Sequence, residues 1–123
     1  MSKYRVLITD YAWPDLELER EILAAADVEL LVSPAQDAAT LSQLAADVDG
    51  ILTCWAVISR QVIEAAGSLR GITRMGIGLD NIDLEECTRR GIPVTNVPDY
   101  CQQEVAEHTL ALLLALARNI GIY

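Results

Sequence analysis

Short continuous apolar runs alternate along the chain with segments in which apolar residues recur every three or four positions. The runs predict strands at residues 5–10, 28–32, 50–53, 72–75 and 94–96, because strands covered on both faces of a sheet lack polar alternation. The helical spacing predicts helices at residues 15–26, 40–46, 59–66 and 83–91. Five strands alternating with four helices favour an α/β fold with a flavodoxin-like, doubly wound parallel five-stranded sheet.

Residues at the ends of the predicted helices favour these boundaries. Thr40 with Gln43 predicts a capping box, in which the two side chains bond each other's backbone N–H groups. Ser59 and Asp83 predict N-caps, because their side-chain oxygens can accept hydrogen bonds from first-turn amides. Gly91 predicts the end of a helix, since glycine adopts the left-handed conformation of a C-cap at low cost.

A fifth helix, expected at about residues 103–120, has apolar residues most of the way round its axis. Such a helix needs cover on all sides, and a five-stranded domain covers only one. We therefore expect its remaining surface to contact another domain or another chain, with a homodimer formed through this helix. On this basis the chain is the front piece of a longer protein, or a fragment that must self-associate.

Composition and charge narrow the function classes. The 123 residues suit one domain, and the formal charge of −9 disfavours direct contact with nucleic acid or an anionic membrane. The apolar run at residues 110–117 is far shorter than the ~20 residues of a membrane span. Cys54, Cys87 and Cys101 are widely spaced, so they predict neither a disulfide framework nor a zinc site and fit the reduced cytoplasm.

The stretch at residues 71–83 carries the clearest candidate chemistry. Gly76 and Gly78 lie between a predicted strand and a predicted helix, and their lack of Cβ atoms lets backbone amides approach a small anion such as a carboxylate. Arg74, just before this turn, either holds a carboxylate with two hydrogen bonds or is a surface arginine. Asn81 stands where the dinucleotide fingerprint has its third glycine, so that fingerprint is weak.

Three other residues have two readings each. Trp55 follows the strand at residues 50–53, where it either lines a pocket at the sheet edge or simply packs. His108 is the only histidine and neighbours Glu107, but adjacent helical residues point about 100° apart and form no dyad. Cys101 precedes the last helix and is either a reactive thiol or a small residue beside a nucleotide. We expect no catalytic residue and no metal ligand in this chain.

Three segments, in order, resemble the signature of one family. Arg-Met-Gly-Ile-Gly-Leu-Asp-Asn-Ile-Asp at residues 74–83, Gly-Ile-Pro-Val-Thr-Asn-Val-Pro at 91–98 and Val-Ala-Glu-His at 105–108 are similar to motifs of the D-isomer-specific 2-hydroxyacid dehydrogenases. Residues 97–101 and the Ala/Leu-rich helix after them most resemble the branch that includes the C-terminal binding proteins. The resemblance implies hydride transfer between NAD or NADP and a small D-2-hydroxy or 2-oxo acid.

The same resemblance implies domains and site residues. Residues 1–100 would form the substrate-binding domain, and residues 101–123 would be the first helix of the NAD-binding domain. The family's catalytic arginine, glutamate and histidine belong to later parts of its chain. The implied substrate-binding residues are Trp55, Arg74, Met75, Gly76, Ile77 and Gly78, and the implied cofactor contacts are Ile77 and Cys101.

Three functions are open at this point. The first is the N-terminal part of a dehydrogenase, with the 123-residue piece inactive by itself. The second is an NAD-sensing, corepressor-like dimeric scaffold that would reach DNA only through partners. The third is a receiver-type signalling domain, for which Asp10 is in place. That domain also needs an aspartate after the strand at residues 50–53 and a lysine after the strand at 94–96, and neither is present.

Overall fold

The computed structural model describes residues 3–121 and contains one five-stranded sheet with the strand order β2-β1-β3-β4-β5. All neighbouring strands are parallel. This order is flavodoxin-like, so the expected doubly wound α/β fold is confirmed. The strands are β1 (Tyr4–Ile8), β2 (Val28–Val32), β3 (Gly50–Thr53), β4 (Gly71–Arg74) and β5 (Val94–Thr95).

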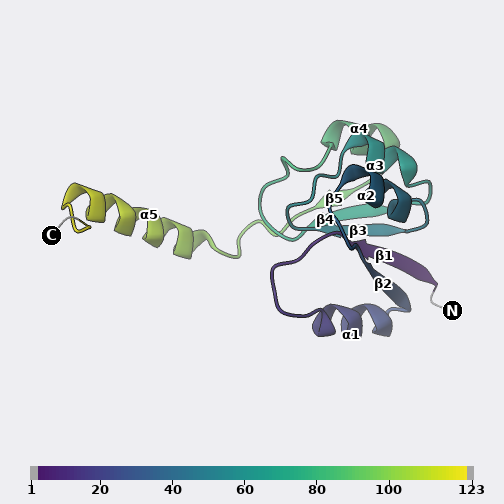
Figure 1. The fold of residues 1–123 in the computed structure, drawn as a ribbon, viewed down its shortest axis with the longest axis horizontal. Coiled ribbons are helices and arrows are strands. Elements are labelled where there is room, and N and C mark those ends of the chain that lie inside the picture. Colours follow the sequence, from purple (N-terminus) through teal and green to yellow (C-terminus); the bar gives the residue numbers. More distant parts are fainter. Residues whose placement is uncertain (1–2, 122–123) are drawn as a thin grey trace.

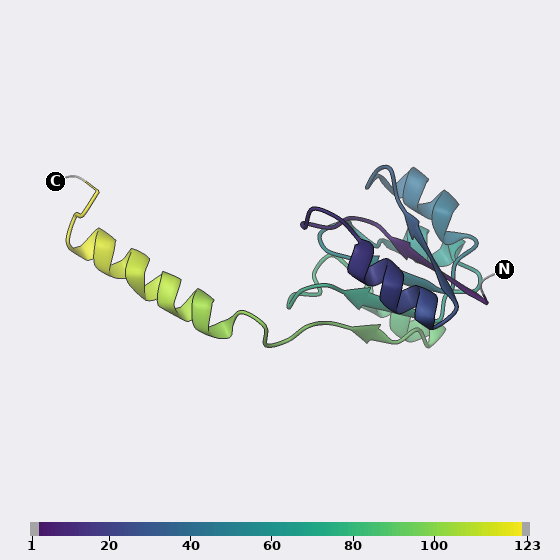
Figure 2. The same cartoon turned by 90° about the horizontal axis from the view of Figure 1, so that it is seen from below.

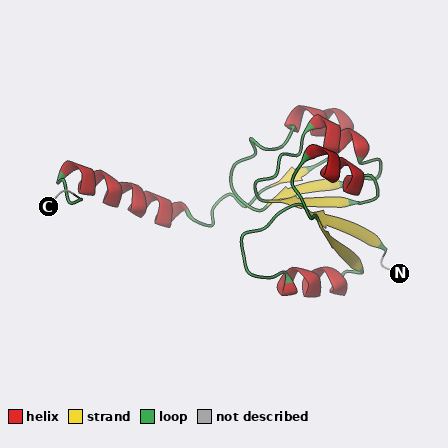
Figure 3. Ribbon diagram, in the orientation of Figure 1, coloured by secondary structure: helices red, strands yellow, loops and turns green. Residues whose placement is uncertain are grey.

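Helices lie on both faces of the sheet (Figures 1 and 3). In Figure 1, α2 (Ala38–Ala45), α3 (Arg60–Ala65) and α4 (Leu84–Arg90) cover one face, and α1 (Glu17–Ala25) covers the other. The asymmetry follows from the right-handed crossovers, because the chain moves outward from β1 to β2 on one face and then returns across β3, β4 and β5 on the other.

The larger apolar core lies between the sheet and the three helices α2, α3 and α4. Leu7, Ile51 and Ile72 contribute to it from neighbouring strands, and each is at most 1% exposed. Successive strand residues point to opposite faces, so a smaller cluster built around Ile8 and Leu30 forms under α1. The buried residues of both clusters are aliphatic apart from Cys87, in keeping with a chain that has no phenylalanine.

The start of α2 differs from the prediction. Its N-cap is Asp37, whose carboxylate accepts a hydrogen bond from the Thr40 amide at 3.0 Å. The predicted capping box of Thr40 and Gln43 is therefore wrong, because a better acceptor stands three residues earlier and the helix begins at Ala38.

The ends of the next two helices agree better with the prediction. Ser59 occupies the N-cap position of α3 but makes no capping hydrogen bond. Asp83 caps α4 by accepting from the Glu86 amide at 2.9 Å. Gly91 follows α4 with φ of 66°, the left-handed conformation that glycine adopts without strain.

Helix α5 (Gln102–Ala117) extends away from the sheet (Figures 1 and 2). None of its residues is buried, and its leucines are 54–77% exposed. Within residues 3–121 its apolar surface is therefore largely uncovered. The expectation that the sheet domain covers one side of it is wrong, because the helix extends away from the sheet. It ends at Ala117 rather than near residue 120, and Asn119 beyond it has φ of 54°. In this range we find no helix with the length and hydropathy of a membrane span.

Candidate functional site

Two loops lie side by side at the carboxyl edge of the sheet. We call residues 54–58 the β3 loop and residues 75–83 the β4 loop. β3 and β4 pair in parallel, and just beyond them the Met75 amide donates to the Thr53 carbonyl at 2.8 Å. Ligands of open α/β sheets bind beyond this edge, so these loops are where a site is expected.

The β4 loop presents a row of backbone amides that have no acceptor. Among the described residues, the N–H groups of Gly76, Ile77 and Gly78 donate to no backbone or side-chain oxygen. Two carbonyls of the loop are occupied instead. That of Gly76 accepts from the Val97 amide at 3.0 Å, and that of Ile77 accepts from Asn96 Nδ2 at 2.8 Å. These bonds hold the loop. Ile77 and Gly78 are exposed, whereas Gly76 is buried against Arg74, so an anion can approach the loop from the side of Ile77 and Gly78.

Arg74 adds positive charge beside these amides. Its Nε donates to the Cys54 carbonyl at 2.9 Å, and within residues 3–121 it forms no ion pair with a carboxylate. A Cβ on Gly76 would lie 3.1 Å from Arg74 Nε and would collide with the rest of the guanidinium. Gly76 therefore makes room for Arg74. A guanidinium with free N–H groups next to free amides is well suited to bind a carboxylate.

The β3 loop already holds a carboxylate, that of Asp10 just after β1. Asp10 is 7% exposed, and it accepts from the amides of residues 54, 55 and 56 at 3.0, 2.7 and 3.4 Å. The Thr9 hydroxyl also donates to it at 2.7 Å, and the Thr53 hydroxyl lies 3.3 Å from it but is nearer to the Ala56 carbonyl. Burial raises the pKa of the Asp10 carboxyl, but these hydrogen bonds outweigh burial and bring the pKa below its ordinary value.

The β3 loop is fixed from several sides and yet exposes Trp55. The Ala56 carbonyl accepts from Asn81 Nδ2 at 2.9 Å and from the Thr53 hydroxyl at 3.1 Å. The Trp55 side chain is nevertheless 60% exposed. A large apolar side chain presented by a well-anchored loop at the ligand-binding edge favours contact with a ligand over core packing.

The remaining residues singled out from the sequence are spread over the structure. The Met75 side chain packs against the cluster under α1, whereas Ile77 is 41% exposed beside the free amides. Cys101 is the half-buried N-cap of α5 and makes no capping hydrogen bond. His108 is exposed on α5. The described part of the chain has no group of three or more His, Cys, Asp or Glu side chains placed to hold a metal ion.

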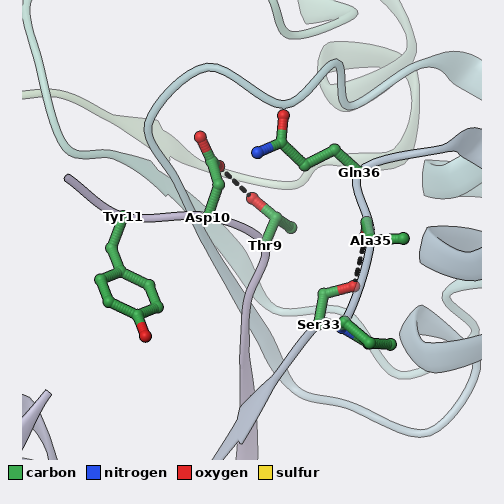
Figure 4. A pocket seen from close by; sticks show the side chains of 7 residues that line it. Thr9, Asp10, Tyr11, Ser33, Ala35 and Gln36 are labelled. Carbon is green, nitrogen blue, oxygen red and sulfur yellow. Dashed lines mark hydrogen bonds between the residues drawn. The ribbon is translucent and has the colours of Figure 1, made fainter. Parts of the chain in front are cut away.

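A pocket of about 450 Å³ lies at the ends of β1 and β2 (Figure 4). It is away from the β4 loop, and Asp10 stands between it and the β3 loop. Asp10 is the residue whose role sequence reasoning missed, although an acid placed directly after a buried apolar run is a signal that could have found it. The pocket is lined by Thr9, Asp10, Tyr11, Ser33, Pro34, Ala35 and Gln36.

The β4 loop does not fit the pyrophosphate of a dinucleotide. Pyrophosphates bind at helix N-termini through free amides, but the Asp83 carboxylate already caps α4 through the Glu86 amide. Asn81 replaces the third glycine of the fingerprint, and its side chain is bonded to the Ala56 carbonyl. The free amides further back, at Gly76 to Gly78, suit a single carboxylate.

Fold and site together define a flavodoxin-like α/β domain with unbonded backbone amides and an arginine at its sheet edge. A sequence model described as "D-isomer specific 2-hydroxyacid dehydrogenase, catalytic domain" matches residues 6–119. The chain belongs to the D-isomer specific 2-hydroxyacid dehydrogenase family. The similar proteins carry the names of reductases and dehydrogenases, so neither a receiver domain nor a corepressor-like scaffold is favoured.

The similar proteins are much longer than this chain. A glyoxylate reductase of Pyrococcus furiosus is 48% identical over 75 residues, covering 60% of this chain and 22% of the relative. A hydroxypyruvate reductase of Thermotoga maritima is 34% identical over 122 residues, covering 98% of this chain and 39% of the relative. The D-lactate dehydrogenase of Aquifex aeolicus, solved with NAD and lactic acid, matches with a TM-score of 0.78 and 28% identity, covering 90% of this chain and 33% of that chain.

Proposed function

We propose that this chain is the substrate-binding part of an oxidoreductase that transfers a hydride between NAD or NADP and a small D-2-hydroxy or 2-oxo acid. The observation that carries the proposal is the row of free amides at Gly76, Ile77 and Gly78 beside the unpaired guanidinium of Arg74. The names of the similar proteins, glyoxylate reductase and hydroxypyruvate reductase, support a 2-oxo acid as the ligand class.

In this proposal the carboxylate of the acid accepts hydrogen bonds from the three amides and from the terminal nitrogens of Arg74. Trp55 contacts the carbon chain of the acid, and Met75 supports the loop from beneath. Ile77 faces both the acid and the cofactor, and Cys101 contacts the cofactor. The cofactor, when bound, supplies or accepts the hydride. The catalytic acid–base residues are not assigned to this chain.

We assign residues 1–100 to the substrate-binding domain and residues 101–123 to the first helix of the NAD-binding domain, with a homodimer formed through this helix. The exposed leucines of α5 support the assignment, since association would bury them. Light scattering should find a dimer for the parent chain and a monomer for a Leu110→Glu, Leu114→Glu double variant. A parent chain that is monomeric at all accessible concentrations would contradict the dimer.

The cytoplasm is the compartment that we propose. The described residues include three cysteines, Cys54, Cys87 and Cys101, and all are free thiols, which suits a reducing environment. The formal charge of −9 argues against direct binding to nucleic acid. Fractionation of cells that express the tagged protein would check the compartment.

The carboxylate site can be tested on the 123-residue chain by ¹H–¹⁵N NMR. Oxamate, a stable analogue of a 2-oxo acid, should shift the amide resonances of Gly76, Ile77 and Gly78 in a saturable manner. Oxamide, which has a similar shape but no charge, should leave them in place. If oxamate shifts no resonance in the β4 loop at concentrations up to about 50 mM, a range that includes millimolar binding, the proposed function is refuted.

The activity of the chain by itself provides a second test. Since the acid–base residues and the nucleotide-binding motif are not assigned to it, the 123-residue chain should not oxidise NADH with glyoxylate, pyruvate or hydroxypyruvate. Turnover by this chain, measured by NADH absorbance, would contradict the division of labour proposed for the two domains.

A further inference from the structure

The carboxylate of Asp10 lies at the point of the fold where an external ligand is usually bound. In the order β2-β1-β3-β4-β5 the chain first moves from β1 outward to β2 and then crosses back to β3. Ligands of doubly wound sheets bind at this reversal, which here lies between β1 and β3. Asp10 follows β1 and bonds the loop that follows β3, so a carboxylate of the chain itself fills the position.

The surroundings of Asp10 have the donors of an anion-binding site. Three successive backbone amides and the Thr9 hydroxyl donate to its oxygens, and Figure 4 shows the bond from Thr9. Over residues 3–121 it has no ion pair with a lysine or arginine. The buried charge is therefore held by N–H and O–H dipoles, as an anion is held in a backbone nest.

The same bonds set the conformation of the β3 loop. Asp10 Oδ1 takes the amides of Cys54 and Ala56, and Oδ2 takes the amide of Trp55. Buried amides that lose their acceptor drive a loop to rearrange, because an unmade backbone hydrogen bond is unfavourable. Trp55 is the middle residue of the three, so the direction of its exposed side chain depends on these bonds.

We propose that Asp10 is a positioning residue of the proposed substrate site: its carboxylate replaces an external anion at the β3 loop and fixes the direction in which Trp55 leaves that loop, next to the β4 loop. This inference rests on the proposed function, in which Trp55 contacts the carbon chain of the bound acid. Asp10 does not touch the substrate, and it acts through the three amides alone.

If the Asp10 carboxylate is a built-in ligand, removing it creates a vacancy that a free carboxylate can fill. In the Asp10→Ala chain the amides of residues 54–56 are left without their acceptor. Formate carries the missing group and is small enough to enter. Chloride at the same ionic strength has the charge but lacks the second oxygen that the Trp55 amide needs, so it should not replace the carboxylate.

The readout is the indole N–H resonance of Trp55 in ¹H–¹⁵N spectra. The indole of Trp13, which packs against the cluster under α1, reports separately on the fold. We expect Asp10→Ala to shift the Trp55 resonance and to weaken oxamate binding at the β4 loop about tenfold. Formate, but not chloride, should return the Trp55 resonance to the parent position with saturation. Glu21→Ala, which removes an exposed acid from α1, should change none of these signals.

A folded Asp10→Ala chain whose Trp55 resonance stays at the parent position, or does not respond to formate, overturns the proposal. If this variant does not fold even with formate, Asp10→Asn decides. If Asp10→Asn shifts the Trp55 resonance away from its parent position and weakens oxamate binding, the proposal is supported. If the resonance and the oxamate affinity both stay as in the parent chain, the proposal is overturned. Failure of the proposed function has a different signature, because the parent chain would then bind no oxamate. The formate response would still show whether Asp10 positions Trp55.

Discussion

The β3 loop and the β4 loop are built alike and used differently. Each follows a central strand, each presents a row of three backbone amides, and the two are joined by the Ile58–Ile82 bridge. In the β3 loop the amides bind the carboxylate of Asp10. In the β4 loop the amides of Gly76, Ile77 and Gly78 have no acceptor within residues 3–121. The carboxylate of the β3 loop belongs to the chain, and in the proposed function a ligand supplies the carboxylate of the β4 loop.

The difference shows how one sheet edge separates stability from binding. The filled β3 loop is anchored by hydrogen bonds to Asp10 and Asn81, and its Cys54 carbonyl accepts the Nε donor of Arg74. Arg74 in turn lies against Gly76 and brings positive charge to the open loop. The internal carboxylate thus helps to orient the cation that makes the second loop attractive to an external carboxylate. Changes to the filled loop should act first on folding, and changes to the open loop should act first on affinity.

The largest expected effect is on stability in the filled loop. Asp10→Ala should lower the free energy of unfolding by about 3 kcal/mol, because several buried donors lose their acceptor together. Asp15→Ala is the matched control, since Asp15 is exposed and accepts only the Glu17 amide at 3.1 Å; its loss should be below about 1 kcal/mol. Urea denaturation measures the free energy of unfolding of both variants. Equal losses would contradict the prediction that the Asp10 carboxylate stabilises the filled β3 loop.

The next effect is on affinity in the open loop. Gly76→Ala should displace the Arg74 guanidinium, which a Cβ would meet, and weaken oxamate binding about tenfold, or about 1.4 kcal/mol. Stability should change by less than about 1 kcal/mol, because a flexible side chain can move aside. Gly67→Ala is the control, since a Cβ there meets nothing within 4 Å. A large stability loss with unchanged oxamate affinity in Gly76→Ala would reverse the comparison.

The sequence was sufficient to predict the open loop but not the filled one. Gly76, Gly78 and Arg74 are neighbours in the chain, so their proximity follows from the strand-turn-helix pattern alone. Asp10 and the amides of the β3 loop are 44 to 46 positions apart in the sequence. The alternation of strands and helices predicted the sheet. The bond also requires the Asp10 side chain to turn toward the loop after β3 rather than the loop after β2, and the alternation does not determine this.

The same limit explains the two local differences at helix starts. The acceptor that caps α2 is the charged carboxylate of Asp37, which is a stronger hydrogen-bond acceptor than the neutral hydroxyl of Thr40. Ser59 has the residue type of an N-cap, but its hydroxyl is buried and has no partner among the described residues. Residue type predicted where a helix begins, but packing around each side chain decides whether the cap bond forms.

A pH titration would sharpen the comparison further. The pKa of Asp10 is lowered because its hydrogen bonds outweigh burial, so the unfolded chain takes up a proton at a higher pH than the folded chain. The stability from Asp10 should be fully present above about pH 4, the ordinary range of an aspartate, and should fall as the pH drops below it. The stability gap between the parent chain and Asp10→Asn should therefore be constant from pH 7 to 5 and shrink toward pH 3.

The stability gap between the parent chain and Asp10→Asn reports on Asp10 and not on the other acids. Glu86 and Asp37 also have a lowered pKa, Glu86 through Arg89 and Asp37 through the Thr40 amide, but both are the same in parent and variant. Cys54, whose amide donates to Asp10, has its pKa raised by burial and then by Asp10, so its thiol stays neutral over this range. A gap that does not change down to pH 3 would show that the charge of Asp10 does not contribute to stability.

The smallest expected effect tests whether the negative charge of Asp80 weakens the binding of an anion at the open β4 loop. A Cβ on Gly78 would lie 2.8 Å from Asp80 Oδ1, so an exposed carboxylate stands beside the free amides and opposes an incoming anion. Asp80→Asn should raise the affinity for oxamate two- to threefold, about 0.5 kcal/mol at low salt. The gain should largely disappear at about 1 M salt, where the Debye length falls to about 3 Å.

Asp80→Asn also separates charge from geometry. Asparagine keeps the size of the side chain, so a change in affinity that depends on salt is electrostatic. The control is Glu21→Gln, which removes an exposed charge from α1 and should leave oxamate affinity unchanged. If Asp80→Asn weakens oxamate binding instead, the aspartate orients the loop rather than repelling the ligand. The open loop would then depend on an internal carboxylate as the filled loop does, and the contrast between them would be one of degree.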